Sequence, residues 1–152
     1  ALDSISDIVW SVNPENDSME KALARMSAYA SEMLENVGTE LRFEVGEGVE
    51  ALMLPMEKRK DFYLIFKEAI HNCAKYAQAK YIEIHLEVKN NTLILNIKDD
   101  GIGFDTKNVH QSMGGNGLKN MQRRAAAIGG TFSIQSNPGD GVTLHVAVPL
   151  VP

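Results

Sequence analysis

The sequence predicts a single α+β domain, in which helices cover one face of a mixed, mostly antiparallel sheet as a two-layer sandwich. Two observations predict it. Apolar residues repeat at helical spacing in some segments and alternate in others, and the segments follow the order helix, strand, helix, strand, strand, helix, strand, strand. The chain has 152 residues, of which 44% are hydrophobic and 23% charged, as expected for one globular domain with its own core.

Three segments carry apolar residues at spacings of three and four and are expected to form helices. Their expected ranges are 18–37, 55–78 and 118–128. Ordinary boundary signals flank them: a capping serine or a proline starts the first two, and glycine follows the first and third.

Five segments alternate apolar and polar residues and are expected to form half-buried strands. They are residues 41–45, 82–88, 93–97, 132–134 and 142–148. An Asn-Asn pair separates the second from the third, and the run NPGDG separates the fourth from the fifth. Both are turn sequences, so these four strands are expected to form two hairpins.

Residues 1–17 precede the first expected helix and end near an Asn13-Pro14 turn signal. We expect them to be a linker, and residues 18–152 to be the folded domain. Because the chain begins at Ala1 without an initiator methionine, we expect it to be a fragment of a longer protein.

Composition excludes several classes of function. The net charge of -5 argues against nucleic-acid binding, which needs many cations. Cys73 is the sole cysteine, so no internal disulfide can form. No apolar run approaches the length of a membrane span. A soluble, cytoplasmic domain without direct membrane contact is the expectation.

The helix expected over 55–78 has a second, polar stripe. Glu68, Asn72 and Lys75 stand at i, i+4 and i+7, within about 60° of one another at the ~100° helical step. An amide oxygen suits magnesium, an ammonium suits phosphate, and a carboxylate can accept a proton or hold a metal-bound water. A solvated helix face would show the same spacing, so the stripe alone leaves both interpretations open.

The run Asp99-Asp100-Gly101-Ile102-Gly103 directly follows an expected strand. Glycine permits close backbone approach, so a ligand could lie against this segment. A carboxylate at Asp99 could accept hydrogen bonds from the amino group of adenine, whereas guanine presents an oxygen there. The alternative is a plain turn with capping aspartates.

A second glycine cluster, residues 114–117, stands before Leu118 and the third helix. Backbone N–H groups at a helix N-terminus favour anions such as phosphate. Residues 105–113 lack a core pattern, as a mobile lid or a surface loop would. Neither glycine cluster completes a P-loop or a dinucleotide-binding fingerprint.

The runs EAIHNCAKYA, DDGIGF and GGNGL, in that order, resemble the N box and the two glycine boxes of the GHKL ATPase superfamily. Within it, the chain is similar to the ATP-binding catalytic domain of bacterial sensor histidine kinases. The run from GLKNMQ to the C-terminal strand most resembles kinases that pair with NarL-type response regulators, and DIVWSVNPEND resembles the segment after their dimerisation helices. The resemblance implies the histidine kinase ATPase (Bergerat) fold.

The resemblance also implies residue roles. Glu68 would be the N-box acid, which polarises a metal-bound water or the phosphoryl acceptor. Asn72 would bind Mg2+ and Lys75 the phosphates of ATP. Tyr76 would pack beside the adenine or ribose, and Asp99 would read the adenine amino group.

For the glycine boxes, the resemblance implies that Gly101 and Gly103 let the base approach. Gly115, Gly117 and the N–H of Leu118 would hold the lid on the phosphates.

One position departs from the family pattern. Superfamily members often carry threonine directly after the glycine of the late strand, where it touches adenine through water. Here Gly141 is followed by Val142, and Thr143 comes one place later. Strand alternation points Thr143 to the opposite face, so we leave it out of the predicted site.

The implied reaction is transfer of the γ-phosphoryl group of Mg-ATP to a histidine on a separate dimerisation domain, with a response regulator downstream. The chain has four histidines, and none has the setting of the family's acceptor: His71, His85, His110 and His145. We expect the acceptor on the upstream part of a parent protein. Sensors of this kind are commonly anchored in a membrane. Two alternatives stay open: a degenerate nucleotide-binding regulatory module, and an anti-sigma-factor-type serine kinase of the same fold.

Overall fold

The computed structural model describes residues 5–13, 18–103 and 117–150. Its helices are α1 (Ile5–Val12), α2 (Met19–Glu35), α3 (Met56–Asn72), the π-helix η2 (Cys73–Ala77) and α5 (Gly117–Ala127). Its strands are β1 (Glu40–Val45), β2 (Tyr81–Lys89), β3 (Thr92–Asp99), β4 (Thr131–Ser136) and β5 (Val142–Pro149). Every helix and strand expected from the sequence is present, and the boundaries differ by a few residues.

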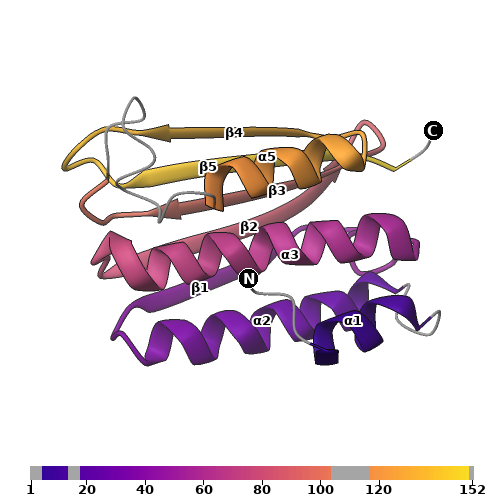
Figure 1. Ribbon diagram of the computed structural model, residues 1–152, viewed down its shortest axis with the longest axis horizontal. Helices are drawn as coiled ribbons and strands as arrows, with labels where there is room; N and C mark the ends of the chain where they lie inside the picture. The colour runs from indigo at the N-terminus through magenta and orange to yellow at the C-terminus, as the bar shows by residue number, and fades with distance from the viewer. Residues whose placement is uncertain (1–4, 14–17, 104–116, 151–152) are drawn as a thin grey trace.

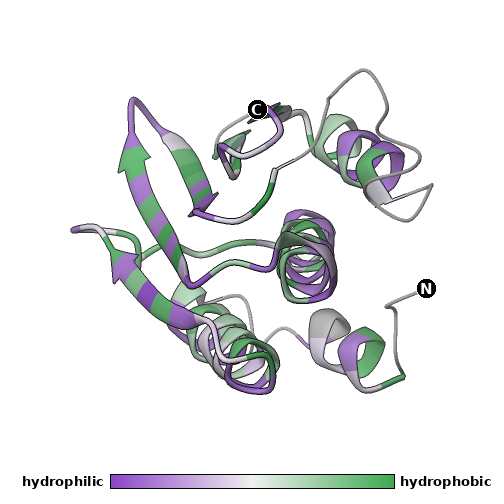
Figure 2. Cartoon of the chain, turned by 90° about the vertical axis from the view of Figure 1, so that its left-hand side faces the viewer, coloured by the Kyte–Doolittle hydropathy of each residue, from purple (hydrophilic) through white to green (hydrophobic). Residues whose placement is uncertain are grey.

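The five strands form one sheet in the order β1-β2-β3-β5-β4. β1 pairs parallel with β2, and the other three pairings are antiparallel. Helices α2, α3 and α5 cover one face of this sheet (Figures 1 and 2). The predicted α+β sandwich with a mixed, mostly antiparallel sheet is confirmed.

The core lies between α3 and the sheet. The apolar stripe of α3, which includes Phe62, Ile65, Phe66 and Ile70, is at most 1% exposed. Alternate residues of β2 and β3 face it, as the burial pattern of both strands shows. Each such side chain contributes about 1.5–3 kcal/mol through removal of apolar surface from water, so this layer fixes the position of α3 on the sheet.

Helix α1 lies within the segment expected to be a linker, and it packs against α3. The carboxylate of Asp7 is 6% exposed and accepts hydrogen bonds from Arg25 of α2, at 2.7 Å, and from Lys67 of α3. The ring of Trp10 lies 5.2 Å from that of Tyr63, centroid to centroid. The sequence pattern of this short helix gave no sign of such a docked position.

Candidate functional site

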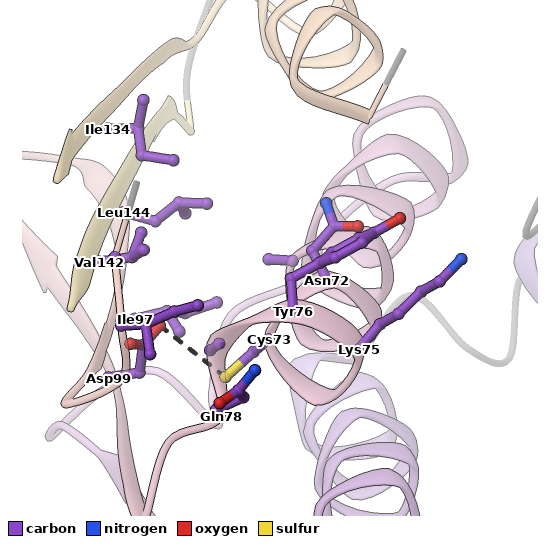
Figure 3. Close-up of a pocket in the computed structure, with 14 residues that line it drawn as sticks. Asn72, Cys73, Lys75, Tyr76, Gln78, Ile97, Asp99, Ile134, Val142 and Leu144 are labelled. Atoms are coloured by element: carbon purple, nitrogen blue, oxygen red, sulfur yellow. Dashed lines mark hydrogen bonds between the residues drawn. The ribbon is translucent and has the colours of Figure 1, made fainter. Parts of the chain in front are cut away.

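A cavity of about 330 Å³ lies between η2 and the strands β3, β4 and β5 (Figure 3). Its apolar wall comes from alternate residues of the three strands. Ile97 stands opposite Leu144, and Leu144 stands opposite Ile134, so these side chains form one row across the sheet. One step further along, Asp99 stands opposite Val142. The cavity thus joins a flat apolar surface to a single carboxylate.

The other wall is the end of the helix that carries the predicted ligand stripe. After Asn72 the α-helix changes to a π-helix, which ends at Gln78 in a left-handed conformation with φ of 51°. A π-helix places more residues in each turn, and such turns are frequent at functional sites. The cavity is lined from this side by Asn72, Cys73 and Tyr76, among others.

Lys75 lies within the π-helix and, like Asn72, lines the cavity. Lys75 is exposed, and its side chain points away from the strand wall (Figure 3). Its ammonium nitrogen lies 5.3 Å from the centroid of the Tyr76 ring. The α-helical step predicts that Lys75 lies in one row with Glu68 and Asn72. Residues 73–77 form a π-helix, so the direction of the Lys75 side chain differs from that prediction.

Glu68 and Asn72 converge on the N-terminus of α5. A Cβ added at Gly117 would lie 3.1 Å from Asn72 Nδ2 and 3.3 Å from Glu68 Oε1. Asn72 is 6% exposed, and its Nδ2 has no hydrogen-bond partner among the described residues. A buried donor without a partner costs about 1–3 kcal/mol, and a helix N-terminus attracts negative charge. The amide is therefore placed to donate to an anionic oxygen.

Asp99 ends β3 on the cavity floor and is 7% exposed. The backbone N–H of Gly101 donates to its Oδ1 at 2.9 Å, and Cys73 Sγ lies 3.9 Å from its Oδ2. Burial raises the pKa of Asp99, and the hydrogen bonds from Gly101, Val142 and Cys73 oppose that rise. Burial and the neighbouring carboxylate raise the pKa of the Cys73 thiol to about 12, so the thiol is protonated.

The first glycine box brings separate parts of the chain together. A Cβ at Gly101 would lie 2.1 Å from the carbonyl oxygen of Ala77, and one at Gly103, where φ is +64°, would lie 2.2 Å from that of Asn137. The N–H of Ile102 donates to the same Ala77 oxygen at 2.8 Å. These glycines are needed first for contact between backbone segments, and only Gly103 of the two lines the cavity.

The remaining predicted residues fall in different places. Tyr76 is half-buried at the cavity, and Leu118 is 7% exposed at the start of α5. Gly115 and the expected lid lie outside the described residues. Val142 lines the cavity and Thr143 does not, as strand alternation predicts.

Sequence reasoning missed several cavity residues. The sequence pattern makes four of them ordinary core positions of strands: Ile97, Ile134, Val142 and Leu144. Only the pairing of β3, β5 and β4 in the sheet brings these side chains together at the cavity. Cys73 read as a core residue of a helix.

No three His, Cys, Asp or Glu side chains converge as a metal site within residues 5–13, 18–103 and 117–150. Nor does any helix in that part of the chain have the length and apolar character needed to cross a membrane.

The apolar cavity with its one carboxylate thus lies next to a helix N-terminus and a buried amide nitrogen that has no partner among the described residues. The model of the family described as histidine kinase-, DNA gyrase B- and HSP90-like ATPase matches residues 57–152. This is more than half of the chain, and the chain belongs to this family.

The chain is also similar to sensor proteins. It is 32% identical to the sensor protein VraS of Staphylococcus aureus, with 70% of this chain and 35% of that protein covered. With VraS of Staphylococcus saprophyticus it is 35% identical, with coverage of 70% and 30%. The chain thus spans about a third of the length of these relatives.

Solved structures share the fold. The histidine kinase AdeS of Acinetobacter baumannii superposes with a TM-score of 0.70 at 16% identity, over 97% of this chain and 77% of AdeS. Full-length ShkA in complex with AMPPNP superposes with a TM-score of 0.71 at 16% identity, over 95% of this chain and 34% of ShkA.

Proposed function

We propose that this domain binds Mg-ATP and presents its γ-phosphoryl group to a histidine on a separate dimerisation domain of a sensor histidine kinase. We further propose that residues 18–152 form the ATP-binding unit, that residues 1–17 connect it to the dimerisation helices, and that a response regulator receives the phosphoryl group. Family membership supports ATP binding, and the similarity to VraS supports a sensor kinase as the parent protein.

The observation that carries the proposal is the unpartnered Nδ2 of Asn72 beside the N-terminus of α5. A triphosphate would satisfy this donor and meet the positive end of the helix dipole. The described residues also suit magnesium without a protein carboxylate cage, because that ion usually keeps water and phosphate oxygens as ligands. Asn72 Oδ1 would be its protein ligand, and the ion, when bound, supplies neutralisation of phosphate charge.

The other residues then have defined tasks. Asp99 accepts a hydrogen bond from the amino group of adenine, and the apolar wall of Ile97 and Leu144 excludes water from the base. Glu68, whose carboxylate lies beside Gly117 at the start of α5, accepts a proton or orients the acceptor. Lys75 points away from the strands, yet its flexible chain can reach phosphate oxygens from outside.

In ShkA, a protein of the same fold, the solved structure contains AMPPNP. This supports the proposal that the fold of the present chain accepts an adenine nucleotide.

Calorimetric titration with Mg-ATP, and with Mg-GTP in parallel, tests the proposal. We expect saturable binding of ATP and none of GTP. Asn72→Ala should weaken ATP binding by about 10- to 100-fold, the effect of losing one hydrogen bond to a charged group. Asn36→Ala, at an exposed asparagine after α2, is the matched control and should bind as the wild type does.

Binding of neither nucleotide would refute the proposal and favour the degenerate module. Phosphorylation of a serine on a separate protein, with no histidine domain supplied, would instead favour the serine kinase. Phosphoryl transfer to a supplied dimerisation domain, lost in Glu68→Gln, is the result expected of a histidine kinase.

A further inference from the structure

We propose that Cys73 is a positioning residue for Asp99: its thiol donates a hydrogen bond that fixes the plane of the carboxylate that reads the 6-amino group of adenine. The inference rests on the proposed nucleotide-binding function and adds a determinant of base specificity to it.

The thiol and the carboxylate face each other inside the cavity. Cys73 Sγ lies 3.9 Å from Asp99 Oδ2, across the gap between η2 and β3 (Figure 3). Both side chains are buried, with 8% and 7% of their surface exposed. Water therefore does not compete for this contact, and a weak S–H donor counts for more here than at the surface.

The proton lies on sulfur. Sγ is the donor in its contact with Asp99 Oδ2, because a carboxylate oxygen can only accept. A protonated thiol can only donate to an ionised carboxylate, so the direction of the hydrogen bond is fixed.

The donors around Asp99 together hold its carboxylate in one orientation. The terminal torsion of an aspartate is broad, so the bonds that its two oxygens accept set the plane of its carboxylate. Gly101 N–H binds Oδ1 at 2.9 Å, and the backbone N–H of Val142 is a further donor to the carboxylate. The thiol binds the other oxygen, Oδ2. The carboxylate that these donors orient lines the cavity, where the base would lie.

The π-helix explains why this donor comes from position 73. Cys73 is the first residue of η2 and follows Asn72, whose side chain serves the other end of the cavity. Consecutive residues of one helix turn thus serve the two ends of a nucleotide. Alanine at 73 would fill nearly the same space without a donor.

Infrared spectroscopy tests the hydrogen bond directly and without nucleotide. Cys73 is the sole cysteine, so the S–H stretching band, which lies where other protein groups do not absorb, belongs to it alone. We expect the band at lower frequency in the wild type than in Asp99→Ala, with Asp99→Asn in between because a neutral acceptor is weaker. Circular dichroism confirms folding of each variant. One frequency in all three proteins would overturn the proposal.

Nucleotide analogues test the positioning role. Cys73→Ala should weaken binding of Mg-ATP by about 3- to 10-fold, the effect of one modest hydrogen bond. Binding of purine riboside 5′-triphosphate, which lacks the 6-amino group, should stay unchanged. Ile134→Ala, which removes apolar wall from β4, is the matched control and should weaken both ligands alike.

The outcomes separate the two proposals. Equal weakening of both ligands by Cys73→Ala would show a packing role and overturn the positioning role. If the wild type binds neither ligand, the proposed function fails together with the role in base recognition, whereas the infrared shift still decides whether the thiol binds the carboxylate.

Discussion

Gly101 has so little space that an alanine in its place should damage both fold and site. A Cβ there would lie 2.1 Å from the carbonyl oxygen of Ala77, 2.8 Å from the carbonyl carbon and 3.0 Å from Cβ of the same residue. The first of these atoms belongs to the backbone and cannot rotate away. The segment after β3 must therefore move away from η2.

The cost follows from the contacts that such a movement breaks. Forcing one methyl group into a packed site costs about 1–3 kcal/mol. The hydrogen bonds from Ile102 N–H to Ala77 and from Gly101 N–H to Asp99 would stretch, at about 1 kcal/mol each. We therefore expect Gly101→Ala to lower the free energy of unfolding by about 3–5 kcal/mol.

Urea unfolding followed by circular dichroism measures this loss, and titration with Mg-ATP measures the effect on the site. Gly38→Ala is the control: unlike Gly101, Gly38 has a positive φ, +73°, and a Cβ there would meet nothing within 4 Å. Its cost should be about 1 kcal/mol, from the backbone conformation alone. A loss at Gly101 no greater than at Gly38, with ATP binding intact, would refute the reasoning.

Two further predictions concern buried carboxylates. Asp7→Ala should weaken the docking of α1 by about 2–4 kcal/mol, below the value for a fully buried pair because the Arg25 side chain is 28% exposed. Fluorescence of Trp10, the sole tryptophan, should then shift to the red without loss of helical signal, and an unchanged spectrum would contradict the docked position. Burial raises the pKa of Asp99 above 3.8, so the folded protein binds the proton of this carboxyl group more tightly than the unfolded chain does. The free energy of unfolding therefore falls as pH rises from 3.8 through the folded pKa. Asp99→Asn should therefore be more stable than the wild type at neutral pH, and the difference should disappear in acid. Urea unfolding over a pH series measures this difference, and a constant difference would contradict the prediction.

The fold could be predicted from the sequence because burial repeats with a regular period. Apolar residues of β2 such as Ile82 and Ile84 alternate with polar ones, and the apolar residues of α3 repeat at spacings of three and four. These spacings predict both the type of each element and the face that it buries. The motifs around Asn72 and Asp99 could be predicted for a different reason: their order along the chain, on elements of the right kind, is specific.

The parts that could not be predicted depend on contacts between distant residues. The docking of α1 requires Asp7 to meet Arg25 and Lys67, and no local pattern encodes that meeting. The outward direction of Lys75 follows from a change of helix type that leaves no mark in the spacing of apolar residues. The contact between Cys73 and Asp99 joins positions 26 residues apart and needs the assembled sheet.

The π-helix also determines how this region tolerates changes in length. One more residue fits into a π turn than into the α turn it replaces, so η2 is in effect a one-residue insertion absorbed at the end of α3. Deleting one residue from 73–77 would restore a regular α-helix, rotate every later side chain of the turn, and draw Ala77 away from the glycine segment that it contacts.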